Sequence, residues 1–231
     1  MRELSTNMAK LTISGDALIT SAISNDFFDC GTIQLSYSEL VMTGGTVQNT
    51  ATGANAAAIW NSTIQIGGTQ SGGMISISGG TVSAAGAGAA IINRNGTINI
   101  SGVKVSATWE GTAMSSHSGE ISISGGTVSA IGGSAIEDFA SSSFQPGGGV
   151  ITISEAHPGT PTLISSASAT QGTIRLNHPM GSAGGFLTIN SGRVENTAYP
   201  GNADARAIIA DANSTVTIEP DAEVVPQYPY P

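Results

Sequence analysis

The chain has 231 residues, among them 31 glycines, with 39% hydrophobic and only 10% charged residues. Sixteen acidic residues against seven basic ones give a net charge of −9, and the basic residues are scattered singly, which argues against nucleic acid and anionic membranes as partners. Cys30 is the only cysteine, so an internal disulfide and a cysteine-based zinc site are excluded, and no cofactor is expected.

The opening segment, MRELSTNMAK, lacks the apolar region of a signal peptide, and no stretch has the roughly 18 apolar residues of a membrane-spanning helix. Insertion into a membrane is therefore not expected. We interpret residues 1–231 as one domain, with residues 1–9 as an N-terminal cap or lead-in. The sequence leaves open whether the chain is cytosolic, virion-borne, or a mature or excised segment of an exported protein.

A repeat of 23 residues organises the middle of the chain. Its copies begin at Gly73, Gly96 and Gly119 and read GMISISGGTVSA, GTINISGVKVSA and GEISISGGTVSA. Ile or Val alternates with Ser or Thr in each copy, which is the period of a strand with one buried face, and the glycines between the strands favour a bend. Degraded copies of the G-x-I-x-I opening are GTIQL at 31, STIQI at 62, GVITI at 149, GTIRL at 172, GFLTI at 185 and STVTI at 214. The irregular spacing at 31–38, 62–73 and 172–185 leaves open that some coils are longer or that GTIQL and STIQI are second strands within one coil.

So short a unit cannot bury its own apolar side and must stack on its neighbours. The sequence therefore predicts an all-β fold, a single-stranded parallel β-helix or solenoid, with coils of about 23 residues over residues 10–224. Two inward ladders are expected, formed by Ile75, Ile98, Ile121 and Ile151 and by Ile77, Ile100, Ile123 and Ile153. The longer step from 119 to 149 indicates an inserted loop at 137–148, and Pro226, Pro229 and Pro231 indicate a tail, 225–231, where strand pairing stops.

The ISGGTVSA…GGSAI units at 75–91 and 121–136 resemble the glycine-rich repeats of bacterial secreted and surface proteins described as carbohydrate-binding-domain or adhesin-like. The likeness covers roughly residues 10–224, and the motifs that are specific to these proteins lie within residues 73–136. It implies a right-handed β-helix of the pectate-lyase-like class, an extracellular or cell-surface location, and a polysaccharide or cell-surface glycan as partner. A fold does not by itself carry a function, so these are expectations.

Polysaccharide-cleaving enzymes of this shape need aspartates that hold Ca²⁺ beside a basic residue, or two carboxylates facing each other across the scissile bond. The Asn-Thr-Asp, Asp-Asp, Gly-His-Gly and Arg-Ile-Lys signatures of polygalacturonase-like enzymes are absent. The best candidates are Glu137 and Asp138 at the mouth of the predicted loop, with Glu110 one coil below on the same side. A solvated loop start would explain the same pair, so no catalytic residue is assigned.

Two histidines follow what look like corresponding strands, His157 in SEAHPG and His178 in LNHPMG. Stacked imidazoles near Glu155 and Arg175 would suit a metal or an acid–base pair. A His-Pro pair also makes a corner, as Ser-Gly-Gly does elsewhere in the chain. No metal site is therefore predicted, and both histidines stay weak catalytic candidates.

Aromatic residues are scarce, and the candidates for stacking on the faces of sugar rings are Trp60, Trp109, Phe139 and Phe144. Each of them would equally well cover the core.

Three functions fit these observations. The leading one is a non-enzymatic extracellular or surface β-helix that recognises glycans or mediates adhesion. The others are a structural stalk, fibre or filament subunit that associates end to end or as a trimer, and a polysaccharide lyase or glycoside hydrolase.

Overall fold

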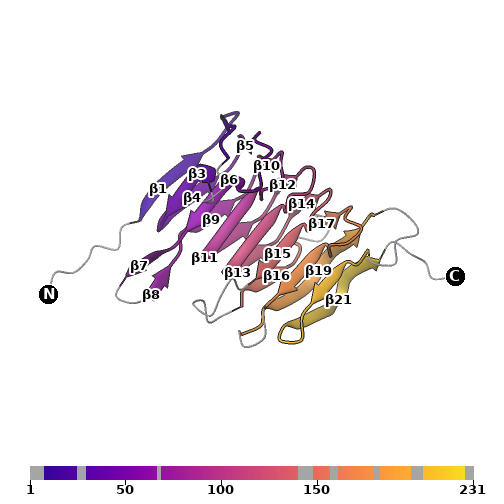
Figure 1. The fold of residues 1–231 in the computed structure, drawn as a ribbon. Coiled ribbons are helices and arrows are strands. Elements are labelled where there is room, and N and C mark those ends of the chain that lie inside the picture. Colours follow the sequence, from indigo (N-terminus) through magenta and orange to yellow (C-terminus); the bar gives the residue numbers. More distant parts are fainter. Residues whose placement is uncertain are drawn as a thin grey trace.

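The computed structural model describes residues 8–24, 30–66, 69–139, 148–156, 161–178, 183–198 and 205–226. These residues contain strands and turns but no helix, and almost all the strands pair in parallel with the strand one coil away. Figure 1 shows the coils following one another along a single axis, from β1 at one end to β21 at the other. The predicted all-β parallel β-helix is confirmed.

The strands form three rows along the axis. The first row contains β1 (Ala9–Ile13), β4 (Ser38–Met42), β9 (Met74–Ile77), β16 (Val150–Ile153) and parts of the long strands β11 (Ile91–Ile100), β13 (Met114–Ile123), β19 (Phe186–Asn196) and β21 (Thr215–Pro226). The second row contains β2 (Leu18–Ser21), β5 (Thr46–Asn49), β10 (Thr81–Ala84), β12 (Val103–Ala107), β14 (Gly126–Ala130), β17 (Thr162–Ser166) and the later parts of β19 and β21.

The third row contains β3 (Cys30–Ser36), β6 (Ala56–Ser62), β15 (Ile136–Phe139), β18 (Ile174–Asn177), β20 (Ile208–Ala210) and the first parts of β11 and β13. The strands β11 and β13 turn from the third row into the first without a break, because Asn95 (φ 51°) and Ser118 (φ 65°) take left-handed backbone conformations. The strands β7 (Ile64–Ile66) and β8 (Thr69–Ser71) form a separate antiparallel pair.

The core lies between the rows and consists of stacked aliphatic side chains. The pairing places Ile75, Ile98, Ile121 and Ile151 in one ladder, which confirms the predicted inward position of these residues. All four are at most 1% exposed. Leu40 and Leu187 continue the ladder on either side. Because each coil meets the same neighbours above and below, the repeat of 23 residues is the spacing that keeps the ladder in register.

Three copies of the degraded opening lie outside the first row, and for GTIQL and STIQI the irregular spacing had left this open. The segments GTIQL and GTIRL belong to the third row, as β3 and β18, and STIQI contributes β7 to the antiparallel pair. The structure also shortens the predicted loop at 137–148, because its first residues belong to β15, which ends at Phe139. The predicted tail begins too early as well, because β21 continues to Pro226, and residues 227–231 lie outside the described part. No helix in the described part is long and apolar enough to cross a bilayer.

Candidate functional site

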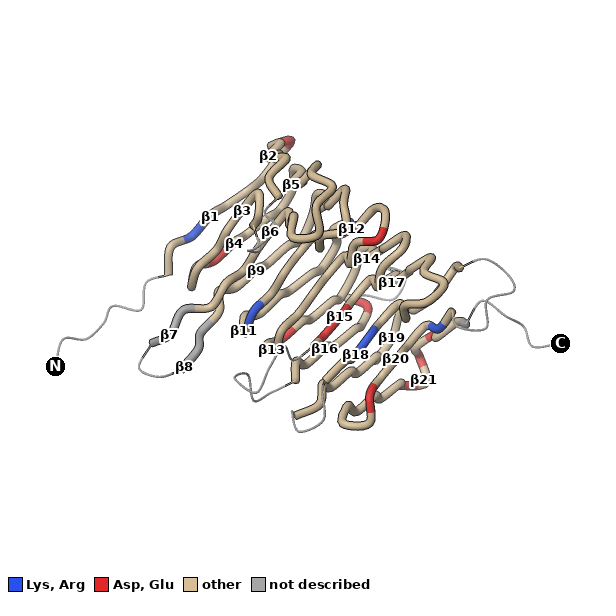
Figure 2. Tube along the Cα trace, in the orientation of Figure 1, with Lys and Arg blue, Asp and Glu red and all other residues tan. Residues whose placement is uncertain are grey.

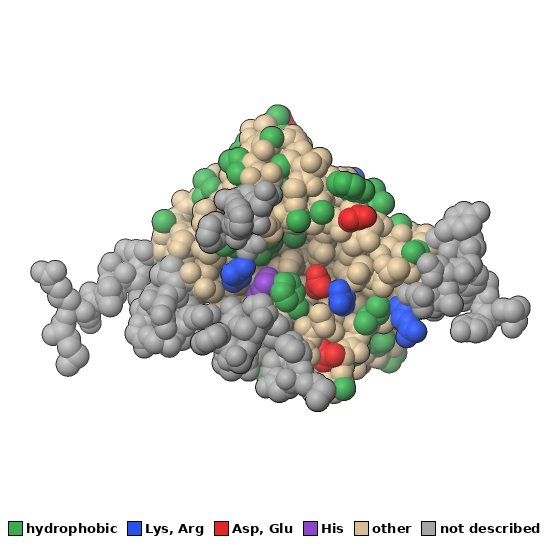
Figure 3. Space-filling view, viewed as in Figure 1, with side chains coloured by type: hydrophobic (Ala, Val, Ile, Leu, Met, Phe, Trp, Pro, Cys, Tyr) green, Lys and Arg blue, Asp and Glu red, His purple; other side chains and the backbone are tan. Residues whose placement is uncertain are grey.

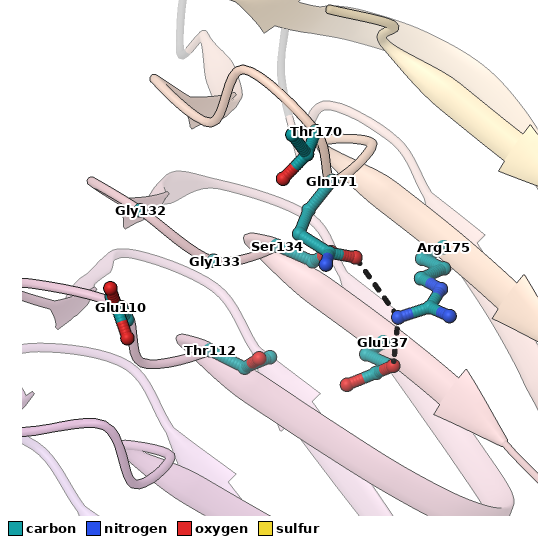
Figure 4. Close-up of a pocket in the computed structure, with 9 residues that line it drawn as sticks. All are labelled: Glu110, Thr112, Gly132, Gly133, Ser134, Glu137, Thr170, Gln171 and Arg175. Atoms are coloured by element: carbon teal, nitrogen blue, oxygen red, sulfur yellow. Dashed lines mark hydrogen bonds and ion pairs between the residues drawn. The ribbon is translucent and has the colours of Figure 1, made fainter. Parts of the chain in front are cut away.

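An open groove of about 350 Å³ lies beside the third row. It is formed largely by the loops that precede β13, β15 and β18 in three consecutive coils. Figure 4 shows its walls, with Glu110 on one side, Glu137 and Arg175 on the other, and Thr112 between them. The lining is mostly polar and consists of Glu110, Thr112, Gly132, Gly133, Ser134, Glu137, Thr170, Gln171 and Arg175. This groove contains two of the candidate acids that the sequence suggested.

Close stacking of short loops forms the floor of the groove. A Cβ atom added to Gly133 would lie 2.5 Å from the carbonyl oxygen of Gly111 one coil below, so this position requires glycine. Ser134 follows Gly133 and is 3% exposed, and its carbonyl accepts a hydrogen bond from the N–H of Ala113. The loops therefore approach each other so closely that only small residues fit, and the longer side chains of neighbouring positions enclose an open space.

Glu137 is the partly buried acid of the groove. Its Oε1 lies 3.2 Å from Nη1 of Arg175, which also donates to Oε1 of Gln171 at 2.9 Å. Burial raises the pKa of Glu137, Arg175 lowers it and Asp138 raises it, and burial prevails, so the pKa lies above its usual range. Glu110 stands on the opposite wall and is exposed, with no hydrogen bond or ion pair to any residue that the structure describes.

Trp109 precedes Glu110 and is the most unusual residue near the groove. Its side chain is 58% exposed, and its backbone has a φ of 69°. Its carbonyl accepts a hydrogen bond from the N–H of Gly132, which lines the groove. A left-handed conformation is a true outlier for so bulky a residue and marks strain that the surrounding structure must hold in place.

The predicted acidic pair Glu137 and Asp138 is wrong in one respect. The two residues lie in β15 and alternate, so that Glu137 faces the groove and Asp138 points into the solenoid with 0% exposure. They therefore cannot act together on one ligand. The pairing of Glu110 with Glu137 is retained, because both line the same groove from neighbouring coils.

Asp138 takes part in a buried polar network instead. Its Oδ2 accepts a hydrogen bond from the N–H of Gly149 at 2.8 Å and lies 3.0 Å from Nε2 of His178. The other ring nitrogen of His178, Nδ1, lies 3.1 Å from Oδ2 of Asp211 and 3.1 Å from Oγ of Ser214. The side chain of His178 is 0% exposed, so this residue joins three coils through the interior and is not a surface acid or base.

The network raises the affinity of His178 for a proton. The hydrogen bond to Asp138 raises the pKa of His178 most, burial lowers it less, and the charges of Asp138 and Asp211 raise it further. Burial also raises the pKa of Asp211, but hydrogen bonds from the backbone N–H groups of His178 and Asn213 and from side chains outweigh it, so the pKa of Asp211 is lowered. These interactions favour the protonated form of the imidazole. His157, the proposed stacking partner, lies outside the described residues.

The other aromatic candidates lie along the outer face of the third row. Trp60 packs against Ala57, Ala89 and Ile92, with the guanidinium carbon of Arg94 5.9 Å from the centre of its ring. The ring of Phe139 lies 3.8 Å, centre to centre, from that of His117. Of the described candidates, Trp60, Trp109 and Phe139 are all absent from the groove lining. Phe144 is outside the part of the chain that the structure describes.

Sequence reasoning missed the hydroxyl and amide groups of the groove, which belong to Thr112, Ser134, Thr170 and Gln171. A signal for two of them was present, because GTAM at 111–114 and GSAI at 133–136 repeat a small polar residue before a third-row strand. Asp138 could also have been placed, since Ile136 points inward and a strand alternates its faces. Asp211 carried no local signal.

A scan against protein-family models found no match, and searches of curated proteins and of solved structures found no similar one. The structure itself gives the class of this protein: it is a parallel β-helix with an open polar groove on the side of the coils.

Proposed function

We propose that the protein is a non-enzymatic glycan-binding β-helix of the extracellular or cell-surface kind, and that the groove holds one sugar unit against Trp109. The observation that carries this proposal is the exposed Trp109, which has a strained left-handed backbone and whose carbonyl accepts a hydrogen bond from Gly132 of the groove lining, although its ring is not part of that lining. Backbone strain at an exposed aromatic residue indicates a position selected for something other than stability.

The chemistry of the groove suits a sugar. A sugar ring has an apolar face of C–H groups, which packs on an aromatic ring, and a rim of hydroxyl groups that both donate and accept hydrogen bonds. Glu110, Gln171 and Thr112 offer acceptors and donors around an open space. Trp109 is not part of the lining, but it precedes Glu110 and bonds Gly132 through its carbonyl, and in this proposal its exposed ring packs on a sugar held at the rim. Most ligand pockets have an apolar lining, whereas here the polar groups predominate and favour a polyhydroxyl ligand.

Binding without cleavage is favoured by the state of Glu137. A general acid must present its proton to the ligand, but one oxygen of Glu137 is engaged by Arg175 at 3.2 Å. Burial nevertheless outweighs the guanidinium and leaves the pKa of Glu137 above its usual range, which is the direction that suits a general acid. Cleavage of the ligand is thus an outcome that the experiment below must be able to detect.

The test is incubation of the purified chain with a panel of plant, bacterial and host polysaccharides, measuring both retained protein and released reducing or unsaturated ends. We expect retention without release, and Trp109→Ala should weaken binding roughly tenfold, because an aromatic contact contributes on the order of 1 kcal/mol beyond its buried area. Phe186→Ala is the matched control, since Phe186 is 53% exposed on the first row and should not affect binding.

The other outcomes are equally informative. Release of new chain ends that stops in Glu137→Gln would make the protein a polysaccharide-cleaving enzyme and overturn the proposal. Retention of no polysaccharide would also overturn it and would favour a structural stalk or fibre, which electron microscopy would reveal.

A further inference from the structure

The groove carries an excess of negative charge at one defined place. Its ionisable residues are Glu110, Glu137 and Arg175, and the last two form an ion pair. The guanidinium of Arg175 is further occupied by Gln171. The carboxylate of Glu110 therefore faces the groove without a compensating cation among the described residues.

No ion pair among the described residues involves Glu110. Figure 2 shows Lys and Arg as isolated segments along the solenoid, and Figure 3 shows them interspersed with Asp and Glu on one face of the molecule. The whole chain has a net charge of −9. An anionic sugar, such as a uronate or a sulfated unit, would meet repulsion on approach, whereas a cationic ligand would be attracted.

Glu110 and Trp109 are also neighbours in the chain, and this pairing has a chemical consequence. A carboxylate accepts hydrogen bonds from an ammonium group, and a Trp ring attracts the same cation through its π face. Together they can recognise a ligand that has an ammonium group next to the apolar C–H face of a sugar ring. Among glycans this combination occurs in amino sugars whose nitrogen is not acetylated.

We propose that the groove selects glycans that contain free-amine hexosamine units, with Glu110 binding the ammonium group while Trp109 packs against the sugar ring. The proposal rests on the glycan-binding function above and adds the ligand class. Glu137 takes no part in this selection because Arg175 already pairs with it, so Glu137 and Gln171 serve the hydroxyl groups of the sugar.

The experiment compares three β-1,4-linked oligosaccharides of equal length, made of glucosamine, N-acetylglucosamine or glucose, by titration calorimetry at about pH 5.5, where amines and most carboxylates are charged. We expect the glucosamine oligomer to bind at least tenfold more tightly than the other two. This preference should shrink at high salt, because part of it is the attraction between opposite charges.

Glu110→Gln keeps the size and the hydrogen-bonding capacity of the side chain and removes its charge. We expect this variant to bind the three oligomers with similar affinity, while Glu120→Gln, on the exposed face of the first row, keeps the preference.

Tight binding of a neutral oligomer with no preference for glucosamine would overturn the ligand class and leave glycan binding intact. A preference that survives Glu110→Gln would overturn the role of Glu110. Absence of binding to all three and to the polysaccharide panel would overturn both proposals.

Discussion

The inner corner of the solenoid, where the third row turns toward the first, is built from amides in its earlier coils and from charges in its later coils. In the earlier half, Nδ2 of Asn61 donates to Oδ1 of Asn93 at 2.9 Å, and Oδ1 of Asn61 accepts from the N–H of Gly73. In the later half, Asp138 occupies the stacked position, and His178 and Asp211 complete the network.

The difference lies in what each side chain can donate. An amide both donates and accepts, so Asn61 and Asn93 satisfy each other and the backbone at the same time. A carboxylate only accepts, so Asp138 needs a donor from another coil, and His178 provides one. The same corner is therefore neutral and independent of pH in one half, and dependent on a proton in the other.

The largest expected effect comes from His178→Ala. This change leaves the buried carboxylate of Asp138 without its ion-pair partner and with only the N–H of Gly149 as a donor, and we expect a loss of about 3–5 kcal/mol in the free energy of unfolding. Urea unfolding followed by circular dichroism measures it, with the exposed neighbour Asn177→Ala as control. A loss under about 1 kcal/mol would mean that the charged corner contributes no more than an ordinary hydrogen bond.

A smaller effect is expected from Asn93→Ala in the amide half. The change removes the donor to the carbonyl of Gly96 and the acceptor for Asn61, and it should cost about 1–3 kcal/mol. The same unfolding experiment at several pH values tests the comparison, with Asn99→Ala on the exposed side of β11 as control. Because no charge is involved, the loss should be the same at each pH, and a loss that varies with pH would contradict the contrast between the two halves.

The subtlest effect is the pH dependence of the wild-type protein. The folded state raises the pKa of His178, so its contribution is fully present below the unfolded pKa of about 6.5 and is lost as pH rises through the higher folded value. We expect stability to fall on the alkaline side of about pH 6.5, as measured by thermal unfolding across pH.

The variant Asp138→Asn sharpens this pH measurement. It removes the hydrogen bond to a carboxylate that contributes most to the raised pKa of His178, so the alkaline loss of stability should be complete at a lower pH and become smaller. NMR titration of the His178 ring should show the same downward movement of its pKa. An unchanged titration would mean that Asp138 does not hold the proton on His178.

The candidate site was only partly accessible from the sequence. The position of Glu110 one coil below Glu137 followed from the repeat, and both residues line the groove. The opposite orientations of Glu137 and Asp138 did not, because a strand that is mistaken for a loop loses its alternation, and a shift of one residue exchanges the two faces of a strand. Arg175 was misplaced for a related reason, since GTIRL resembles the first-row strands but pairs in the third row.

The sequence by itself determined the stacking of coils and the aliphatic ladders, because these depend on a short repeat in which each Ile meets its own copy one coil away. Only the tertiary structure decided the groove and the Asp138–His178–Asp211 network. Both join residues from coils whose lengths differ, and the distance between Asp138 and Asp211 along the chain has no periodic signal. Spacing in the sequence predicts contacts between like residues, whereas contacts between unlike residues require the three-dimensional register.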